Sequence, residues 1–258
     1  MVIRRIREHV TTHNWFAVAV DLGILVAGVF LGTQANNWNE ARIERAAGAE
    51  SRREIIDDLR NNEVDIESRK VYYGAVRDHA LKALGAMESA GQPRGEPFLI
   101  DAYEASQVWA RPLVRAGYDE MTNAGLSRSV GDRETRSRLT TYYAQIRQFD
   151  VTALNSTPYR ERLRRALPYP VQSAIRERCK ERVTFLKSGA QVASLAKACG
   201  VGLDDATIKR ATARLDSADL VEDLTRHIAD LDQKLDGFDR FARLARELRL
   251  HLEAAERR

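Results

Sequence analysis

An acidic residue inside an apolar segment is the feature of this sequence with the clearest chemical potential. Asp21 is the single charge in the run from Trp15 to Ala35, WFAVAVDLGILVAGVFLGTQA. An ionised carboxylate at the centre of a bilayer costs about 2.5 to 3.5 kcal/mol on insertion scales, and less toward an interface. Asp21 therefore either reaches the headgroups or is protonated, or it faces a partner helix, and the sequence leaves these alternatives open.

The two cysteines are the second group of residues that could do chemistry. Cys179 and Cys199 are the only thiols in the chain, and a short segment separates them. In an oxidising compartment they could close a loop with a disulfide, a constraint worth roughly 3 kcal/mol in the chain-entropy model. Two independent buried thiols are the alternative. We expect the disulfide if this part of the chain is exported.

Motifs for enzyme chemistry or cofactor binding are absent from the sequence. It contains no phosphate-binding Gly-rich loop, no His-Glu-x-x-His and no Cys-x-x-Cys. His9 and His13 have the spacing of one helix face, but two ligands without a third do not make a metal site. We therefore expect no catalytic residues, no metal and no cofactor, and a protein that is not an enzyme.

Charge composition argues against another class of partner. The chain has 41 Lys and Arg and 37 Asp and Glu, for a net charge of +4, and the two signs are interleaved. No field of one sign covers such a protein, so we do not expect a nucleic-acid partner. From Arg160 to Lys187, nine basic residues accompany three Glu. This stretch is either a solvated helix face or a contact with anionic headgroups.

The element that must position Asp21 is a transmembrane helix, which we place at residues 15–38. The 21 residues from Trp15 to Ala35 would rise about 31 Å as a helix, the thickness of a bilayer core. Trp15 and Trp38 bracket the run as interface anchors. A cleaved signal peptide is the competing interpretation, but the run is longer than such a peptide needs. We expect the chain to cross the membrane once.

Basic residues around this helix predict its orientation. Residues 1–14 form a short basic flank with Arg4, Arg5 and Arg7, and four further arginines follow soon after Trp38. A large C-terminal domain can translocate largely regardless of its charge, whereas a short flank with clustered arginines resists crossing. We therefore expect a protein of the bacterial inner membrane with a cytoplasmic N-terminus and a periplasmic C-terminal domain.

Small residues in the predicted span indicate the close approach of a second helix. Gly28 and Gly32 are four residues apart, and Gly23 lies between two alanines at the same spacing. Gln34 could add a hydrogen bond between helices. Besides the lipid bilayer, the predicted partner is a second copy of the chain or another membrane protein.

Two stretches of the sequence resemble a known family. Asp21 opens an apolar run that closes in LGTQANNWNEAR (residues 31–42), and YDEMTNAGLSRSVGDRETRSRLTTYY follows at residues 118–143. Both are similar to segments of a family of bacterial single-span membrane proteins that carries no established activity, and Met121 stands where that family usually has Leu. The resemblance covers roughly residues 1–150 and implies a membrane anchor with a helical extracytoplasmic domain.

Beyond the span, the hydrophobic pattern predicts an all-α protein. Residues 39–90 contain no proline and carry one face at alternating steps of four and three, so we expect the membrane helix to continue as a stalk. Gly and Pro at residues 91–97 predict a loop. We expect residues 98–258 to form a coiled-coil-like helical domain. Its last helix, at about 204–253, has heptad-like spacing and would be an antiparallel partner for the stalk or a self-association seam. The stalk face comprises Ile55, Leu59, Asn62, Ile66, Arg69, Tyr73, Val76, Ala80, Ala83 and Met87.

These features predict a membrane-anchored, non-enzymatic envelope protein that acts through self-association or by docking on a membrane partner. The alternative is a subunit of an ion-driven membrane complex. A basic flank, one span with an early Asp and an exported domain also resemble the plan of stator and energy-transducing B-type subunits. In that alternative, Asp21 is the intramembrane carboxylate that binds the coupling ion.

Overall fold

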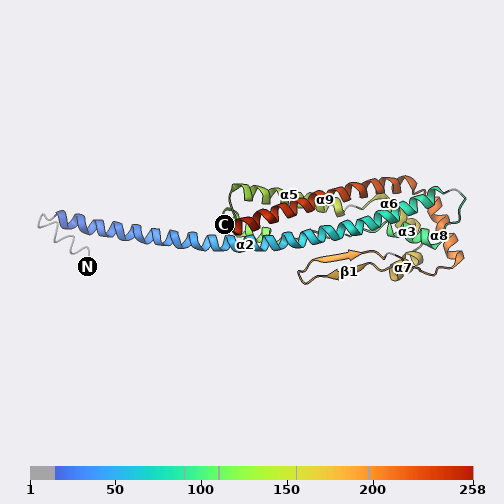
Figure 1. Cartoon of the computed structure of the whole chain (residues 1–258), viewed down its shortest axis with the longest axis horizontal. Coiled ribbons are helices and arrows are strands. Elements are labelled where there is room, and N and C mark those ends of the chain that lie inside the picture. The colour runs from blue at the N-terminus through green and yellow to red at the C-terminus, as the bar shows by residue number, and fades with distance from the viewer. Residues whose placement is uncertain (1–14, 90, 110, 155, 197, 258) are drawn as a thin grey trace.

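The computed structural model describes residues 15–89, 91–109, 111–154, 156–196 and 198–257. Most of the described chain is helical, and the other elements pack along one part of a long N-terminal helix (Figure 1). The predicted basic flank 1–14 lies outside the described residues, and with it Arg4, Arg5, Arg7, His9 and His13.

Helix α2 runs without interruption from Trp15 to Glu88 and contains the residues of both the predicted span and most of the predicted stalk. Its 74 residues give a length of about 110 Å. No proline occurs before Pro93, so nothing in the sequence interrupts the backbone hydrogen bonds of this helix. Gly91, with a left-handed φ of 78°, turns the chain after the helix. The apolar segment and the domain are thus joined by one continuous helix.

Shorter helices, one 3₁₀ turn and a second long helix complete the domain. Proline in the first turn starts α3, α6 and α7, where its missing N–H has no intrahelical partner to lose. Thr157 and Asp204 cap α6 and α8 with side-chain oxygens. The elements are α3 (Glu96–Glu104), α4 (Ala116–Asn123), η1 (Leu126–Arg128), α5 (Arg133–Leu154), α6 (Pro158–Ala166), α7 (Tyr169–Arg178), α8 (Asp205–Ala218) and α9 (Val221–Glu256).

Helix α9 packs antiparallel along the domain half of α2 (Figure 1). The stalk face from Ile55 to Ala83 is buried in this contact and beneath the shorter helices. The last helix is therefore a partner for α2 within the same chain, the first of the two alternatives that its spacing allows. Ion pairs follow the antiparallel register: Arg53–Glu256, Arg60–Glu253, Glu63–Arg249, Lys70–Asp239 and Arg77–Asp232.

The helix predicted at 204–253 is divided into α8 and α9, which corrects the sequence prediction. Asp219 takes a left-handed conformation, with a φ of 46°, between the two helices. The sequence has no Gly or Pro at this point. The break is instead stabilised by a residue that is distant in the sequence. Arg162 of α6 donates hydrogen bonds to the carbonyl oxygens of Ala218 and Asp219 and pairs with Asp223. These bonds satisfy carbonyl groups that a helix end leaves without partners.

The described chain is mostly helical, as the predicted all-α class requires, and a small β-hairpin is a local departure that the sequence did not predict. Strands β1 (Arg182–Phe185) and β2 (Gln191–Ser194) pair antiparallel, with Val183 opposite Ala193. Strand β2 lies against α2, where the N–H of Ala193 donates to Ser68 Oγ at 3.1 Å, whereas β1 is exposed along its whole length. A two-stranded hairpin is marginally stable by itself. Its formation here depends on α2, a support that the local sequence does not reveal.

Close backbone contacts mark where the domain begins along α2. A Cβ atom at Gly48 would overlap the backbone of Ser129, and one at Gly117 would lie 3.0 Å from Glu54. Glycine, which has no side chain, lets η1 and α4 approach the long helix this closely. Residues 22–46 of α2 are exposed without exception. The N-terminal part of the helix therefore extends from the domain uncovered (Figure 1).

Candidate functional site

The uncovered N-terminal part of α2 is apolar. Its mean hydropathy is 1.8 over an 18-residue window, and none of that window is buried. Among the described residues, this is the one helix long and apolar enough to cross a membrane. An apolar surface of this size without a cover in the described chain is typical of segments that contact lipid or another protein. Its large apolar side chains are Trp15, Phe16, Val20, Leu22, Ile24, Leu25, Val26, Val29, Phe30, Leu31, Trp38 and Ile43.

Helical geometry sorts the small and polar residues of this segment onto two sides. At 3.6 residues per turn, Asp21, Gly28 and Gly32 share one side of α2, whereas Gly23 and Gln34 share the opposite side. A Cβ atom at any of the three glycines would meet nothing within 4 Å. Packing within the described chain therefore does not require these glycines, and both sides are open to a second helix.

Polar and aromatic residues follow the apolar segment along the helix. Asn36 Nδ2 donates to Glu40 Oε1 at 2.7 Å, and the guanidinium of Arg42 lies 5.9 Å from the centre of the Trp38 ring. Trp15 and Trp38 are about 35 Å apart along the helix. This separation suits two headgroup layers on either side of a hydrocarbon core of about 30 Å.

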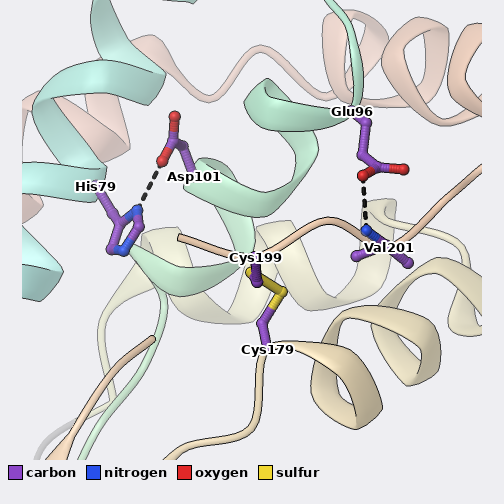
Figure 2. The surroundings of a disulfide bond; sticks show 6 residues. All are labelled: His79, Glu96, Asp101, Cys179, Cys199 and Val201. Atoms are coloured by element: carbon purple, nitrogen blue, oxygen red, sulfur yellow. Dashed lines mark hydrogen bonds and ion pairs between the residues drawn. A yellow bond between two sulfur atoms is a disulfide. The ribbon is translucent and has the colours of Figure 1, made fainter. Parts of the chain in front are cut away.

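A disulfide joins Cys179 and Cys199, whose Cα atoms are 5.4 Å apart (Figure 2). Cys179 follows α7 and Cys199 precedes α8, so the bridge closes the segment that contains the β-hairpin. Glu96 of α3 accepts hydrogen bonds from the N–H groups of Val201 and Leu203 at 2.7 and 2.6 Å. Burial alone would raise the pKa of Glu96, but these hydrogen bonds to the ionised carboxylate outweigh it, so the pKa of Glu96 lies below its ordinary value. The disulfide and Glu96 together hold this connection on the domain.

Buried polar side chains of α2 hold an irregular segment of the chain. The N–H of Val114 donates to Asn62 Oδ1 at 2.8 Å, and its carbonyl accepts from Asn62 Nδ2 at 2.7 Å. Asp58 accepts from the N–H of Gly117 at 2.7 Å. Backbone groups outside regular structure need such partners where they are buried. Polar residues of α2, including one on the predicted stalk face, thus dock residues 111–117 on the helix.

Arg69 is fully buried on the same face and pairs with Asp65, which is 5% exposed. It also donates to the carbonyl oxygen of Arg111 and lies 5.9 Å from the centre of the Trp109 ring. Burial raises the pKa of Asp65, and the charge and hydrogen bond of Arg69 oppose that shift. The heptad pattern places Arg69 on the stalk face but does not reveal these partners, because two of them lie far away in the sequence.

Glu104, the last residue of α3, is 2% exposed, and neither carboxylate oxygen has a hydrogen-bond partner among the described residues. Burial raises the pKa of Glu104 to about 7, against the opposing effects of His79, Gln107 and Arg164. The buried hydroxyl of Tyr72 also has no hydrogen-bond partner in the described chain. From the sequence alone, Glu104 is an ordinary polar residue of a short helix, so only its burial identifies it.

The basic stretch from Arg160 to Lys187 is not a uniformly solvated face. Arg160 donates to the carbonyl oxygen of Ser106. The guanidinium of Arg164 lies 3.7 Å from the centre of the Tyr103 ring and donates to Ser106 Oγ at 2.8 Å. Helix α6, which carries these arginines, lies toward the end of the domain that is farthest from the apolar segment (Figure 1). Several charges of this stretch therefore stabilise the fold.

Comparison with protein-family models, with curated proteins and with solved structures finds no match to this chain. Among the side chains that the structure describes, no group of three or more His, Cys, Asp or Glu residues could hold a metal ion. Fold and site define a class: a mostly helical protein whose long N-terminal helix is apolar enough to cross a membrane and continues into the domain.

Proposed function

We propose that this chain is a single-pass protein of the bacterial inner membrane, in which residues 15–38 span the bilayer and the helical domain acts by association rather than catalysis. One observation supports this proposal most strongly: the apolar side chains between Trp15 and Trp38 are exposed, and no described part of the chain covers them. Transfer of such a surface from water into a bilayer is favourable. A helix also satisfies its own backbone groups there.

The proposal includes an orientation. Residues 1–14, with their three arginines, stay in the cytoplasm, and the domain lies in the periplasm. The disulfide between Cys179 and Cys199 supports this orientation, because disulfides persist in the periplasm and are rare in the cytosol. The resemblance that we expect of residues 31–42 and 118–143 to a family of bacterial single-span proteins would imply the same architecture.

The proposed partner meets α2 inside the bilayer. Gly28 and Gly32 let a second helix approach closely on the side that also carries Asp21, and Gly23 and Gln34 offer a second side. A second copy of the chain is the simplest partner, since each copy supplies the same surface to a two-fold contact. In the alternative, an ion-driven complex, Asp21 binds the coupling ion against a different membrane subunit.

Replacing both Gly28 and Gly32 by Leu should abolish a crosslinked oligomer in the membrane, since bulky side chains separate close-packed helices. The variant should still insert, because leucine favours insertion, and resistance to alkaline extraction checks this. Asp21→Asn is the matched variant, because it keeps the size of the side chain and removes the charge. The measurement is chemical crosslinking in native membranes followed by electrophoresis.

The outcomes of this experiment separate the two candidate functions. Loss of the oligomer with the leucine pair but not with Asp21→Asn assigns the contact to helix packing and excludes ion coupling through Asp21. Loss with Asp21→Asn at unchanged abundance favours the ion-driven complex. Extraction of the unmodified protein by alkali would contradict the membrane anchor itself.

The two cysteines test the orientation. In protein taken from cells without reductant and unfolded, Cys179 and Cys199 should resist a thiol label, and both should react after reduction, because an exported domain is oxidised. The added mass of the label counts the reacted thiols. The variant Cys179→Ser leaves Cys199 without its disulfide partner, so Cys199 should react with the label before any reduction. Two free thiols in the unreduced parent protein would overturn both the disulfide and the exported orientation.

A further inference from the structure

Resting on the proposed anchor, we propose a second contact with the bilayer: the end of the domain nearest the apolar segment sits on anionic lipid headgroups. This membrane-facing end consists of η1, the start of α5 and the last turn of α9. The C-terminal end of α9 and the start of α5 lie where the domain begins along α2 (Figure 1), and the backbone of Ser129, which follows η1, lies against Gly48 of α2. Three contacts hold it together: Arg52 donates to the Val130 carbonyl at 3.0 Å, Arg53 pairs with Glu256, and Thr135 Oγ1 bonds with His251 Nε2 at 2.8 Å.

The continuous helix sets the height of this end above the bilayer. Gly48 follows Trp38 after about 15 Å of helix, and no Gly or Pro lies between them. A headgroup layer is about 5 to 7 Å thick. With Trp38 at the headgroups, the membrane-facing end therefore lies within about 10 Å of the lipid surface. A transmembrane tilt of about 20° lowers one side of the domain further.

This height is comparable to the range of electrostatic attraction. The Debye length is about 8 Å at physiological ionic strength and about 30 Å at 0.01 M. Charges on the membrane-facing end therefore feel the potential of an anionic surface, and they feel it more strongly at low salt. Charges at the opposite end of the domain, tens of ångströms farther along α2, lie beyond this range at physiological salt.

Arginines without acidic partners give the membrane-facing end its charge. Arg128 of η1, Arg133 at the start of α5 and Arg257 after α9 are exposed, and none forms an ion pair with an acidic residue in the described ranges. The acidic side chains at the start of α5 and in the last turn of α9 are engaged within the protein: Glu134 with Arg138, Glu256 with Arg53, and Asp132 with the N–H of Thr135. Three guanidiniums are thus available to phosphate groups.

The charge that matters lies on the domain rather than on the bare helix below it. Between Trp38 and the domain, Glu40 and Glu44 balance Arg42 and Arg45. The attraction that we propose therefore depends on the three arginines of the membrane-facing end. This makes the contact separable from insertion of α2, which depends on its apolar side chains.

The test uses the full chain reconstituted into vesicles of phosphatidylcholine, with or without phosphatidylglycerol. Ala124→Cys introduces a thiol at an exposed position beside η1, and an impermeant donor dye marks the domains that face outward. Energy transfer to an acceptor on the lipid headgroups reports the height of the domain. Transfer should be higher in the anionic vesicles at low salt and should fall to the phosphatidylcholine value as salt increases.

Two triple variants complete the design. Arg128→Gln, Arg133→Gln and Arg257→Gln together should abolish the extra transfer in anionic vesicles. Equal transfer in both kinds of vesicle for the parent protein, or an unchanged response in this variant, would overturn the proposal. Extraction of the protein by alkali would instead refute the anchor and, with it, this contact. The matched control makes the same change of charge at the opposite end, with Arg176→Gln, Arg178→Gln and Arg210→Gln, and should respond like the parent.

Discussion

Replacing Asp65 by alanine should lower the free energy of unfolding of the domain by about 3 to 5 kcal/mol, because it leaves the buried Arg69 charge without its partner. Arg69 is 0% exposed and Asp65 5%, so water does not replace the lost carboxylate. The measurement is denaturant unfolding of the detergent-solubilised chain, followed by the loss of helical circular dichroism.

Two further variants separate the ion pair from a general effect of substitution. Asp57→Ala removes an exposed carboxylate that pairs with Arg60 on the same helix, and it should cost less than about 1 kcal/mol. Replacing Asp65 and Arg69 together by leucine should recover much of the stability lost in Asp65→Ala, since neither charge of the buried pair remains. Equal destabilisation by Asp65→Ala and Asp57→Ala would show that the buried ion pair contributes no more to the free energy of unfolding than the exposed one.

Glu104→Gln should make the protein more stable at pH 8 by up to about 3 kcal/mol and change little below pH 5. The folded state raises the pKa of Glu104 to about 7 from an ordinary value of 4.5, because burial disfavours the ionised carboxylate. The folded state therefore binds the proton more tightly than the unfolded state. The resulting stability is fully present below about pH 4.5 and is lost as the pH rises through about 7.

The measurement is the free energy of unfolding of the parent and of Glu104→Gln between pH 5 and pH 8. Other groups also titrate, so the informative quantity is the difference between the two proteins at each pH. Glu67→Gln changes an exposed carboxylate on α2 and should leave the parent's pH dependence intact. A constant difference between Glu104→Gln and the parent across this range would contradict a raised pKa at Glu104.

Two features could be predicted from local sequence patterns: the long apolar N-terminal helix, and the face of its domain half that is buried. An uninterrupted apolar run without proline favours one helix, and steps of four and three residues mark the side that must be covered. Asp21, Gly23, Gly28, Gly32 and Gln34 could be singled out for the same reason. Their roles in association stay predictions, because the described chain leaves this part of α2 uncovered.

The polar interior could not be predicted, because its residues acquire a role through segments that are distant in the chain. Asn62 and Arg69 occupy positions of an apolar face and become useful only when residues 111–114 lie against α2. Glu104 becomes unusual only when other elements exclude water from it. The burial that raises the pKa of Glu104 comes from residues distant in the chain, so the local pattern around Glu104 does not reveal it.

The sequence by itself determined that the chain is mostly helical, that its N-terminal helix is long and apolar, and which face of the stalk is buried, since helix periodicity depends on residues three and four positions apart. Only the tertiary structure decided how those faces are covered, where the last helix breaks and where a hairpin forms. Arg162 reaches from α6 to the end of α8, and Ser68 of α2 holds β2. Each contact joins residues more than fifty positions apart, and the chain brings such residues together only when apolar burial outweighs the entropy of closing the loop between them.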